Sequence, residues 1–225
     1  MNQMLRKAMV SGLFVSIGTE LDAEEDFPPG ASDYRSAFCA RVFPEDLDDE
    51  ALEQVAMSEG VREEDGALII PVGHGHFVLC DLQVSSQDIW EALDAREGDL
   101  ETVGSLVLDL DNDGLSEDLP IDIEPFMGGF IIVNNVEINP AWTGAKLGLL
   151  GTALALRHWS FGCGLAALYP MKPGAKGIER DTSSAALAKY WGQLGFVELS
   201  GNVFVAPVDR HRMDAFIAKM MNSAR

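Results

Sequence analysis

Near the middle of the sequence, a run of β-branched residues leads through a proline into a helical pattern. The run opens the segment FIIVNNVEINPAWTGAKLGLLG, which spans residues 130–151. Five of its first nine residues are Val or Ile, a composition typical of a buried strand. Pro140 lacks a backbone donor and ends the strand. We therefore predict a strand, a short Pro/Gly loop, and a helix that opens at Thr143 and Gly144, because apolar residues then recur at helical spacing.

The first turn of this predicted helix is suited to bind an anion. The first N–H groups of a helix have no partner within the helix, and the helix dipole makes this end positive. Gly144 and Gly148 carry no side chain there, so an anion can approach the backbone closely. The pattern therefore predicts a phosphate-binding turn.

Length and composition favour a soluble globular protein. The 225 residues suffice for one large domain or two small ones, and no apolar run is long enough to span a membrane. The apolar stretch near the N-terminus is short and is followed by an acidic segment, so we interpret it as a first strand or helix and not as a signal peptide. Three widely spaced cysteines, Cys39, Cys80 and Cys163, indicate reduced thiols and a cytoplasmic location.

The net charge of −20 is unevenly distributed. Residues 1–125 hold 30 acidic and 6 basic side chains, whereas residues 126–225 hold 6 acidic and 10 basic ones. The acidic half repels nucleic acid and attracts cations, and the basic half contains the predicted phosphate site. An acidic surface also serves solubility alone, which is the commoner case. The asymmetry favours an anionic cofactor on one half and a cationic substrate on the other.

The rest of the chain predicts a mixture of strands and helices without an internal repeat. Before the central segment, we predict strands over 9–17, 36–43 and 103–110, two short strands or a hairpin over 67–84, and helices over 44–59 and 86–96. After it, we predict a strand over 165–169, a helix over 182–194 capped by Asp181 or Thr182, a hairpin of 197–199 with 202–206, and a helix over 208–221. This order indicates a mixed α/β fold with an antiparallel first half and a β-α-β-α-β second half.

Two segments of the second half resemble motifs of the GNAT superfamily of N-acetyltransferases. Residues 138–148, INPAWTGAKLG, resemble its acetyl-CoA motif, in which a strand ending in V-x-P precedes R/Q-x-x-G-x-G/A at the start of a helix. Residues 186–196, ALAKYWGQLGF, resemble the later helix and strand of the family, usually written A-x-x-L-Y-x-K-L-G-F. The motifs occur in the family's order, and the resemblance covers roughly residues 129–207.

This resemblance implies an α/β (α+β) fold with a GNAT-like, mostly antiparallel twisted sheet flanked by helices. In that fold the fourth and fifth strands splay apart, and the pantetheine arm of the cofactor lies between them. We expect a single domain over residues 1–225. It would comprise an acidic half of the sheet (1–125), an acetyl-CoA-binding half (126–207) and a C-terminal helix (208–225).

The same resemblance implies acetyl-CoA as co-substrate. Backbone groups of Ile138 would face the pantetheine and the thioester, and the backbone N–H groups of residues 143–148 would hold the pyrophosphate. One further residue, Ser184, occupies a position where the family often has Asn. The predicted cofactor-binding residues are Ile138, Thr143, Gly144, Ala145, Lys146, Leu147, Gly148 and Ser184.

The sequence departs from the family pattern at three positions that matter for activity. Thr143 stands where the family has Arg or Gln, and Lys146 stands where it has its middle Gly. Trp191 stands where many members have a Tyr that protonates the leaving thiolate. A lysine near the turn can contact a phosphate oxygen, but it also crowds the turn. These departures favour the alternative of a GNAT-like protein without transferase activity.

Acetyl transfer to an amine requires a base for the amine and an acid for the departing thiolate. Tyr190, next to Trp191, is the predicted general acid, and Glu137 on the central strand is the predicted base. Both residues have a structural alternative. Glu137 fits a solvated strand position, and Tyr190 fits a packed helix position with its hydroxyl at the surface.

Three other patterns were weighed as metal or nucleophile sites. Asp109 to Gly114 copies the first half of an EF-hand loop, but its twelfth position is Pro120, which favours a turn between strands with calcium as the minor alternative. His74 and His76 share a face of a strand but lack a further Cys/His pair, which favours a local strand with polar residues. Cys163 lies between two glycines and fits a small core residue.

We therefore predict an acetyl-CoA-dependent N-acetyltransferase that acts on the amine of a small molecule or peptide, with a cationic acceptor favoured. The alternative is a catalytically inactive GNAT-like protein that binds CoA or a protein partner. We expect no nucleic acid, membrane or metal ion as a partner. The apolar C-terminal helix is compatible with a homodimer interface as well as with a core.

Overall fold

The fold is described from a computed structural model, which places residues 1–19, 29–96, 98–121, 128–170 and 178–223. A single sheet of eight strands draws on both halves of the sequence. Its main path runs β1–β2–β4–β5–β6–β8–β7, and β3 pairs with one end of β4. The strands are β1 (Leu13–Thr19), β2 (Ala31–Val42), β3 (Arg62–Glu64), β4 (Ala67–Asp81), β5 (Gly129–Ile138), β6 (Cys163–Leu168), β7 (Val197–Ser200) and β8 (Val203–Pro207).

All strand pairs are antiparallel except β5 with β6, which are parallel. Parallel neighbours need a crossover connection, and the helix α5 (Leu147–Trp159) provides it. The predicted fold class is confirmed: the structure is mixed α/β, with a mostly antiparallel sheet flanked by helices.

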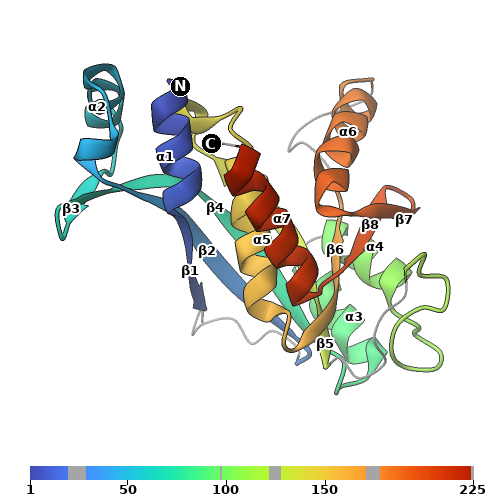
Figure 1. Cartoon of the computed structure of the whole chain (residues 1–225). Coiled ribbons are helices and arrows are strands. Elements are labelled where there is room, and N and C mark those ends of the chain that lie inside the picture. The colour runs from blue at the N-terminus through green and yellow to red at the C-terminus, as the bar shows by residue number, and fades with distance from the viewer. Residues whose placement is uncertain (20–28, 97, 122–127, 171–177, 224–225) are drawn as a thin grey trace.

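Helices cover both faces of the sheet (Figure 1). On one face, α1 (Gln3–Gly12), α5 and α7 (Arg210–Ser223) lie side by side, and α6 (Ile178–Trp191) adds Trp191 to the same core. On the other face, α3 (Ser86–Asp94) and α4 (Gly98–Val107) pack over part of β4, β5, β6 and β8. The short helix α2 (Asp49–Ala56) follows the turn η1 (Pro44–Asp46). Among the described residues, no helix combines enough length and apolar character to cross a membrane.

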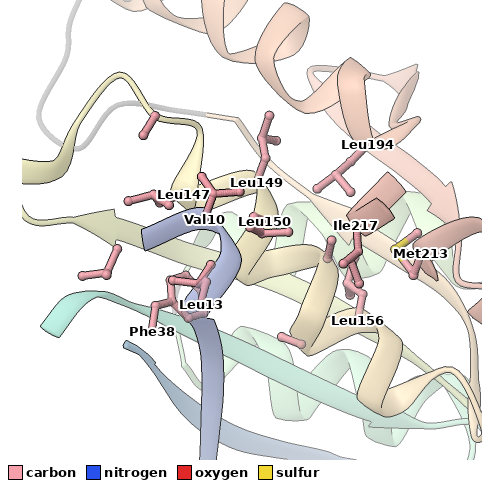
Figure 2. Packing of buried hydrophobic residues seen from close by; sticks show 14 of the residues in the cluster. Val10, Leu13, Phe38, Leu147, Leu149, Leu150, Leu156, Leu194, Met213 and Ile217 are labelled. Atoms are coloured by element: carbon pink, nitrogen blue, oxygen red, sulfur yellow. The ribbon is translucent and has the colours of Figure 1, made fainter. Parts of the chain in front are cut away.

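The larger core lies between α5 and the sheet. Side chains of α5 gather there with those of α1, β2 and α7, including Leu150, Val10, Phe38 and Met213 (Figure 2). Nearly every residue of α5 is buried, as expected of a helix that is apolar on all sides. The two buried residues of α7, Met213 and Ile217, are part of this core, so this side of the C-terminal helix packs within the chain.

Several predicted elements are confirmed. The central strand, the helix over 86–96, the hairpin of β7 with β8 and the C-terminal helix occur where the pattern indicated. The predicted strand at 165–169 is β6, and that at 36–43 is the second half of β2. In these segments, local propensity and burial in the fold agree.

Two predicted strands were wrong over most or part of their length. Residues 103–110 lie mainly in α4, whose Leu100, Val103 and Val107 face the second core at helical spacing. Residues 9–12 end α1, which the Asn2 side chain caps and which buries Leu5 and Met9. A short apolar run does not distinguish a strand from a buried helix. In both segments, packing of an apolar helix face against the core selects the helix.

Three boundaries also differ from the predictions. Residues 67–81 form one long strand, and the hairpin lies earlier, where Asp65 and Gly66 connect β3 to β4 with φ of 52° and 74°. The central helix begins at Leu147 and not at Thr143. Helix α6 begins at Ile178, so the predicted cap at Asp181 or Thr182 lies inside it.

Candidate functional site

The loop between β5 and α5 is held by its own side chains and by the core. Asn139 accepts a hydrogen bond from the backbone N–H of Ala141 at 3.1 Å, and a turn of 3-10 helix, η2 (Pro140–Trp142), follows. Trp142 is fully buried and anchors this turn in the core. The chain therefore leaves the strand in a fixed direction and delivers residues 143–146 to the start of α5.

Two residues of this loop have the left-handed backbone conformation. Gly144 has φ of 87°, and a Cβ atom there would meet no other atom within 4 Å. Lys146, directly before α5, has φ of 59°, which costs a non-glycine residue about 1 kcal/mol. This is the position where the resemblance places a glycine. The Lys146 side chain turns toward the end of α6, where its Nζ atom donates to Oε1 of Gln193 at 2.6 Å.

Several backbone N–H groups at this turn have no hydrogen-bond acceptor among the residues that the structure describes. Within the described part of the chain, no acceptor is bonded to the N–H groups of residues 144–148. The side chains of Ala145 and Leu147 are buried, so a ligand at the turn would meet only their backbone. Thr143, Gly144 and Lys146 are exposed. Thr143 donates its hydroxyl to the Pro140 carbonyl at 3.0 Å. The backbone donors of residues 144–148 thus have no acceptor within the described residues, and the anion site stays a prediction.

Tyr190 reaches this turn from the end of α6. Its hydroxyl oxygen accepts a hydrogen bond from the backbone N–H of Leu149 at 3.1 Å. A Cβ atom on Gly148 would lie 2.9 Å from that oxygen and 3.3 Å from Cγ1 of Ile138, so only glycine fits between them. Burial raises the pKa of the Tyr190 hydroxyl, and the hydrogen bond from Leu149 only partly offsets this effect. The neighbouring Trp191 is buried in the core and does not reach the turn.

Beside this turn, the pairing of β5 with β6 ends, because β6 itself ends at Leu168. Their parallel pairing covers residues 129–132 of β5 and ends at Ile132 with Ala167. Strand β5 continues to Ile138, bonded on its other side to β4. Within the described residues, the stretch 133–138 of β5 therefore has no strand partner on the β6 side. These two strands are the fourth and fifth along the path of the sheet.

Glu137 and Tyr190, the two predicted catalytic residues, lie on opposite faces of the sheet. Val136 and Ile138 point toward Gly148 and Tyr190, and Glu137 between them points the other way. Its carboxylate is exposed, accepts a hydrogen bond from Asn135 at 2.8 Å and lies 3.7 Å from Nε2 of His74. The structure thus brings Tyr190 together with the predicted cofactor residues and does not bring Glu137 to them. The side chain of Ser184 lies outside the described residues.

On the same face as Glu137, the fold assembles a polar cluster that the sequence did not predict. Asp33 of β2 accepts hydrogen bonds from Nε2 of His76 and from Nε of Arg96, both at 2.8 Å. The other ring nitrogen of His76, Nδ1, accepts from Nδ2 of Asn134 at 3.0 Å. Three of these residues come from β2, β4 and β5, and Arg96 follows α3. The only sequence signal was His74 with His76 on one strand face, because the partners of His76 lie 43 and 58 residues away.

The patterns weighed as metal sites have structural partners instead. Asp109 accepts from the N–H groups of Asp111 and Asn112, and Asp113 accepts from the N–H of Ser86 at the start of α3, so this segment is a turn that braces a helix. No group of three or more His, Cys, Asp or Glu side chains in the described ranges is arranged to hold a metal ion. Cys163 is buried, and burial raises the pKa of its thiol to about 12, as expected of a core residue.

Comparisons of the chain with protein-family models, with curated proteins and with solved structures found no match.

Proposed function

We propose that this protein is an acetyl-CoA-dependent N-acetyltransferase. The observation that carries the proposal is the continuity of two features. The pairing of β5 with β6 ends at Ile132, and β5 continues into a turn whose N–H groups at residues 144–148 have no acceptor in the described chain. An extended pantetheine arm would lie along the unpaired side of β5, and the pyrophosphate would bind at the turn. This is the arrangement that the GNAT resemblance implies.

Tyr190 supports the chemical part of the proposal. Its hydroxyl oxygen accepts the Leu149 N–H, so the hydroxyl proton remains free to be donated. A proton donor beside the start of α5 suits the departing thiolate of CoA, which needs a proton when the C–S bond breaks.

The acceptor in this proposal is a primary amine that carries positive charge at neutral pH. The support is the acidic balance of residues 1–125, which also speaks against nucleic acid as a ligand. We further propose a reducing compartment such as the cytoplasm, because all three cysteines are free thiols.

A second candidate function is binding of CoA without transfer, and two contacts favour it. The Lys146 ammonium is tied to Gln193 next to the turn, and the Leu149 N–H is already occupied by Tyr190. A protein with these contacts could hold CoA or a partner without chemistry.

The test has two steps. Thermal unfolding of the full chain is measured with acetyl-CoA, with CoA and with adenosine alone, because a ligand that binds only the folded state raises the melting temperature. We expect a shift with acetyl-CoA and CoA but not with adenosine, and no shift with millimolar acetyl-CoA would refute both candidate functions. Thiol release is then followed with a panel of primary amines, and binding without release would favour the second candidate.

A further inference from the structure

We propose that His76 is the base that takes the proton from the acceptor amine, and that Asp33 and Arg96 position it. This inference rests on the proposed function and adds the residue that activates the acceptor. It assigns a role to a cluster on the face of the sheet opposite Tyr190.

The hydrogen bonds of the cluster fix the state of the imidazole. The Nδ2 group of Asn134 donates to Nδ1 of His76, so Nδ1 is the acceptor in this arrangement. The opposite nitrogen, Nε2, then carries the proton and donates it to Asp33 at 2.8 Å. A carboxylate in this place holds the tautomer and stabilises the imidazolium that forms when Nδ1 accepts a proton.

Asp33 is kept in the charged form that this role requires. Burial acts to raise the pKa of its carboxyl, but the hydrogen bonds from His76 and Arg96 and the positive charge of Arg96 outweigh burial, so the pKa lies below its ordinary value. Arg96 is itself anchored, because its side chain is only 6% exposed and it also donates to the Ala31 carbonyl at 2.9 Å.

The cluster lies close to the point where the pairing of β5 with β6 ends. The pairing of β4 with β5 contains a bulge next to His76, and Asn134 is the extra residue of that bulge. Asn134 comes two residues after Ile132, the last residue of β5 that pairs with β6. Asn134 therefore lies in the stretch of β5 proposed for the pantetheine arm, and its amide contacts the base. The His76 side chain is 27% exposed, and in the proposed complex the acceptor amine replaces the Asn134 amide as the donor to Nδ1.

Other charged groups also face His76. Arg35 of β2 and Asn135 of β5 lie opposite it in the strand register, and His74 lies two residues away on the same face beside Glu137. Among these groups, Glu137 is the rival base. Its carboxylate is 61% exposed and bonded only to Asn135 and His74 in the described residues. The His76 ring, by contrast, is held in place by both Asp33 and Asn134.

The proposed step is balanced. The acceptor ammonium gives one proton to Nδ1 of His76, and the neutral amine attacks the thioester carbonyl of acetyl-CoA. A C–N bond forms and the C–S bond breaks, so that the thiolate of CoA leaves with the electron pair. The thiolate takes up a proton from Tyr190, and the proton that the nitrogen of the new amide loses restores the Tyr190 hydroxyl through water. His76 later returns its proton to water.

The experiment compares two amines in the full-length protein with acetyl-CoA. Cadaverine is an ammonium ion at neutral pH and needs a base, whereas trifluoroethylamine is largely neutral there and does not. We expect His76→Gln to lower kcat/KM for cadaverine about 10²-fold and to abolish the acid limb of its pH profile. Turnover of trifluoroethylamine and the thermal shift with acetyl-CoA should stay unchanged. Asp33→Asn should lower kcat for cadaverine with little change in KM, and the exposed His211→Gln is the matched control.

Each other outcome overturns the inference. An equal loss for both amines in His76→Gln would show a structural role, and loss of the acid limb in Glu137→Gln alone would assign the base to Glu137. Wild-type protein that binds acetyl-CoA but releases no thiol with either amine would also refute it. These results leave cofactor binding intact, whereas wild-type protein without an acetyl-CoA shift would refute the proposed function itself.

Discussion

The hydroxyl oxygen of Tyr190 lies 3.1 Å from the backbone nitrogen of Leu149, so the end of α6 is bonded to the first turn of α5 across 41 residues of sequence. Because the first N–H groups of a helix lack partners within it, this contact satisfies one of them directly. Within the described residues, the N–H groups of residues 144–148 beside it have no acceptor. The Tyr190 side chain thus supports the loop before α5 and also presents its hydroxyl proton at the start of that helix.

Replacing Tyr190 by Phe removes this hydroxyl and little else. We expect the free energy of unfolding to fall by about 1 kcal/mol, because a largely buried N–H loses its acceptor. We also expect kcat for thiol release to fall about 10²-fold while the acetyl-CoA thermal shift persists. Tyr34→Phe is the control, since the Tyr34 hydroxyl makes no hydrogen bond within the described residues. Full turnover in Tyr190→Phe would exclude the residue as the acid.

Gly144 allows a charge test at the turn with two isosteric variants. Asn and Asp both tolerate the left-handed conformation that Gly144 has, and a Cβ atom there meets no neighbour. Gly144→Asp should abolish the thermal shift with acetyl-CoA, because a carboxylate repels the pyrophosphate. Gly144→Asn should retain most of it. Equal shifts in both variants would place the phosphates away from this turn.

Gly151 lies where α5 packs on β2, and it tests the core. A Cβ atom there would approach the ring of Phe38 to 2.7 Å, and Phe38 is fully buried and cannot move aside. Overpacking typically costs about 1–3 kcal/mol, and the helix propensity of Ala offsets about 1 kcal/mol of this. Chemical denaturation of Gly151→Ala should therefore show a net loss. Gly162→Ala, with no atom within 4 Å of the added Cβ, should change stability little.

The lowered pKa of Asp33 makes the free energy of unfolding depend on pH. Its pKa is lower in the folded protein than the ordinary value of about 4, so its contribution is fully present above that value and is lost as pH falls through the folded pKa. Asp33→Asn should lower the melting temperature at neutral pH, and the gap to wild type should narrow below about pH 4. The exposed Asp65→Asn should show no such gap. If the difference in melting temperature between wild type and Asp33→Asn does not depend on pH, the Asp33 carboxylate does not stabilise the fold through its charge.

Lys146 is strained by its backbone and bonded through its side chain, and two variants separate these effects. Lys146→Gly relieves a left-handed conformation worth about 1 kcal/mol, partly offset by the greater freedom of glycine when unfolded. We expect unchanged or slightly higher stability and a retained acetyl-CoA shift, measured by thermal unfolding. Gln193→Ala breaks the same hydrogen bond without touching the backbone. Loss of the shift in Lys146→Gly alone would identify the ammonium as a phosphate ligand.

The central unit of strand, turn and helix was predictable because its signals are local. The β-branched run forms β5, Pro140 ends it, and the apolar pattern of residues 147–156 forms α5. By contrast, residues 103–110 combine apolar and small side chains that suit a strand or a helix, and only packing of Val103 and Val107 on the second core selects the helix.

The site was predictable only in part, for a related reason. Glycines and a proline mark a turn within a few residues, so the turn at 143–148 was visible in the sequence. The cluster of Asp33, His76 and Asn134 depends on the register of three strands. Asp33 and Asn134 are 43 and 58 positions away from His76 in the sequence. The register between two strands depends on which face of each strand is buried. One strand alone therefore does not show how it pairs with a strand far away in the sequence.

A β-sheet normally offers unsatisfied main-chain groups only at its two outer strands, and natural proteins protect such strands against unwanted pairing. Here the pairing of β5 with β6 ends at Ile132, and within the described residues the stretch 133–138 forms a further margin of this kind. An extended molecule bound along that stretch would continue the ladder. Two asparagines and a glutamate along the margin, Asn134, Asn135 and Glu137, keep it polar, which disfavours pairing with another protein chain.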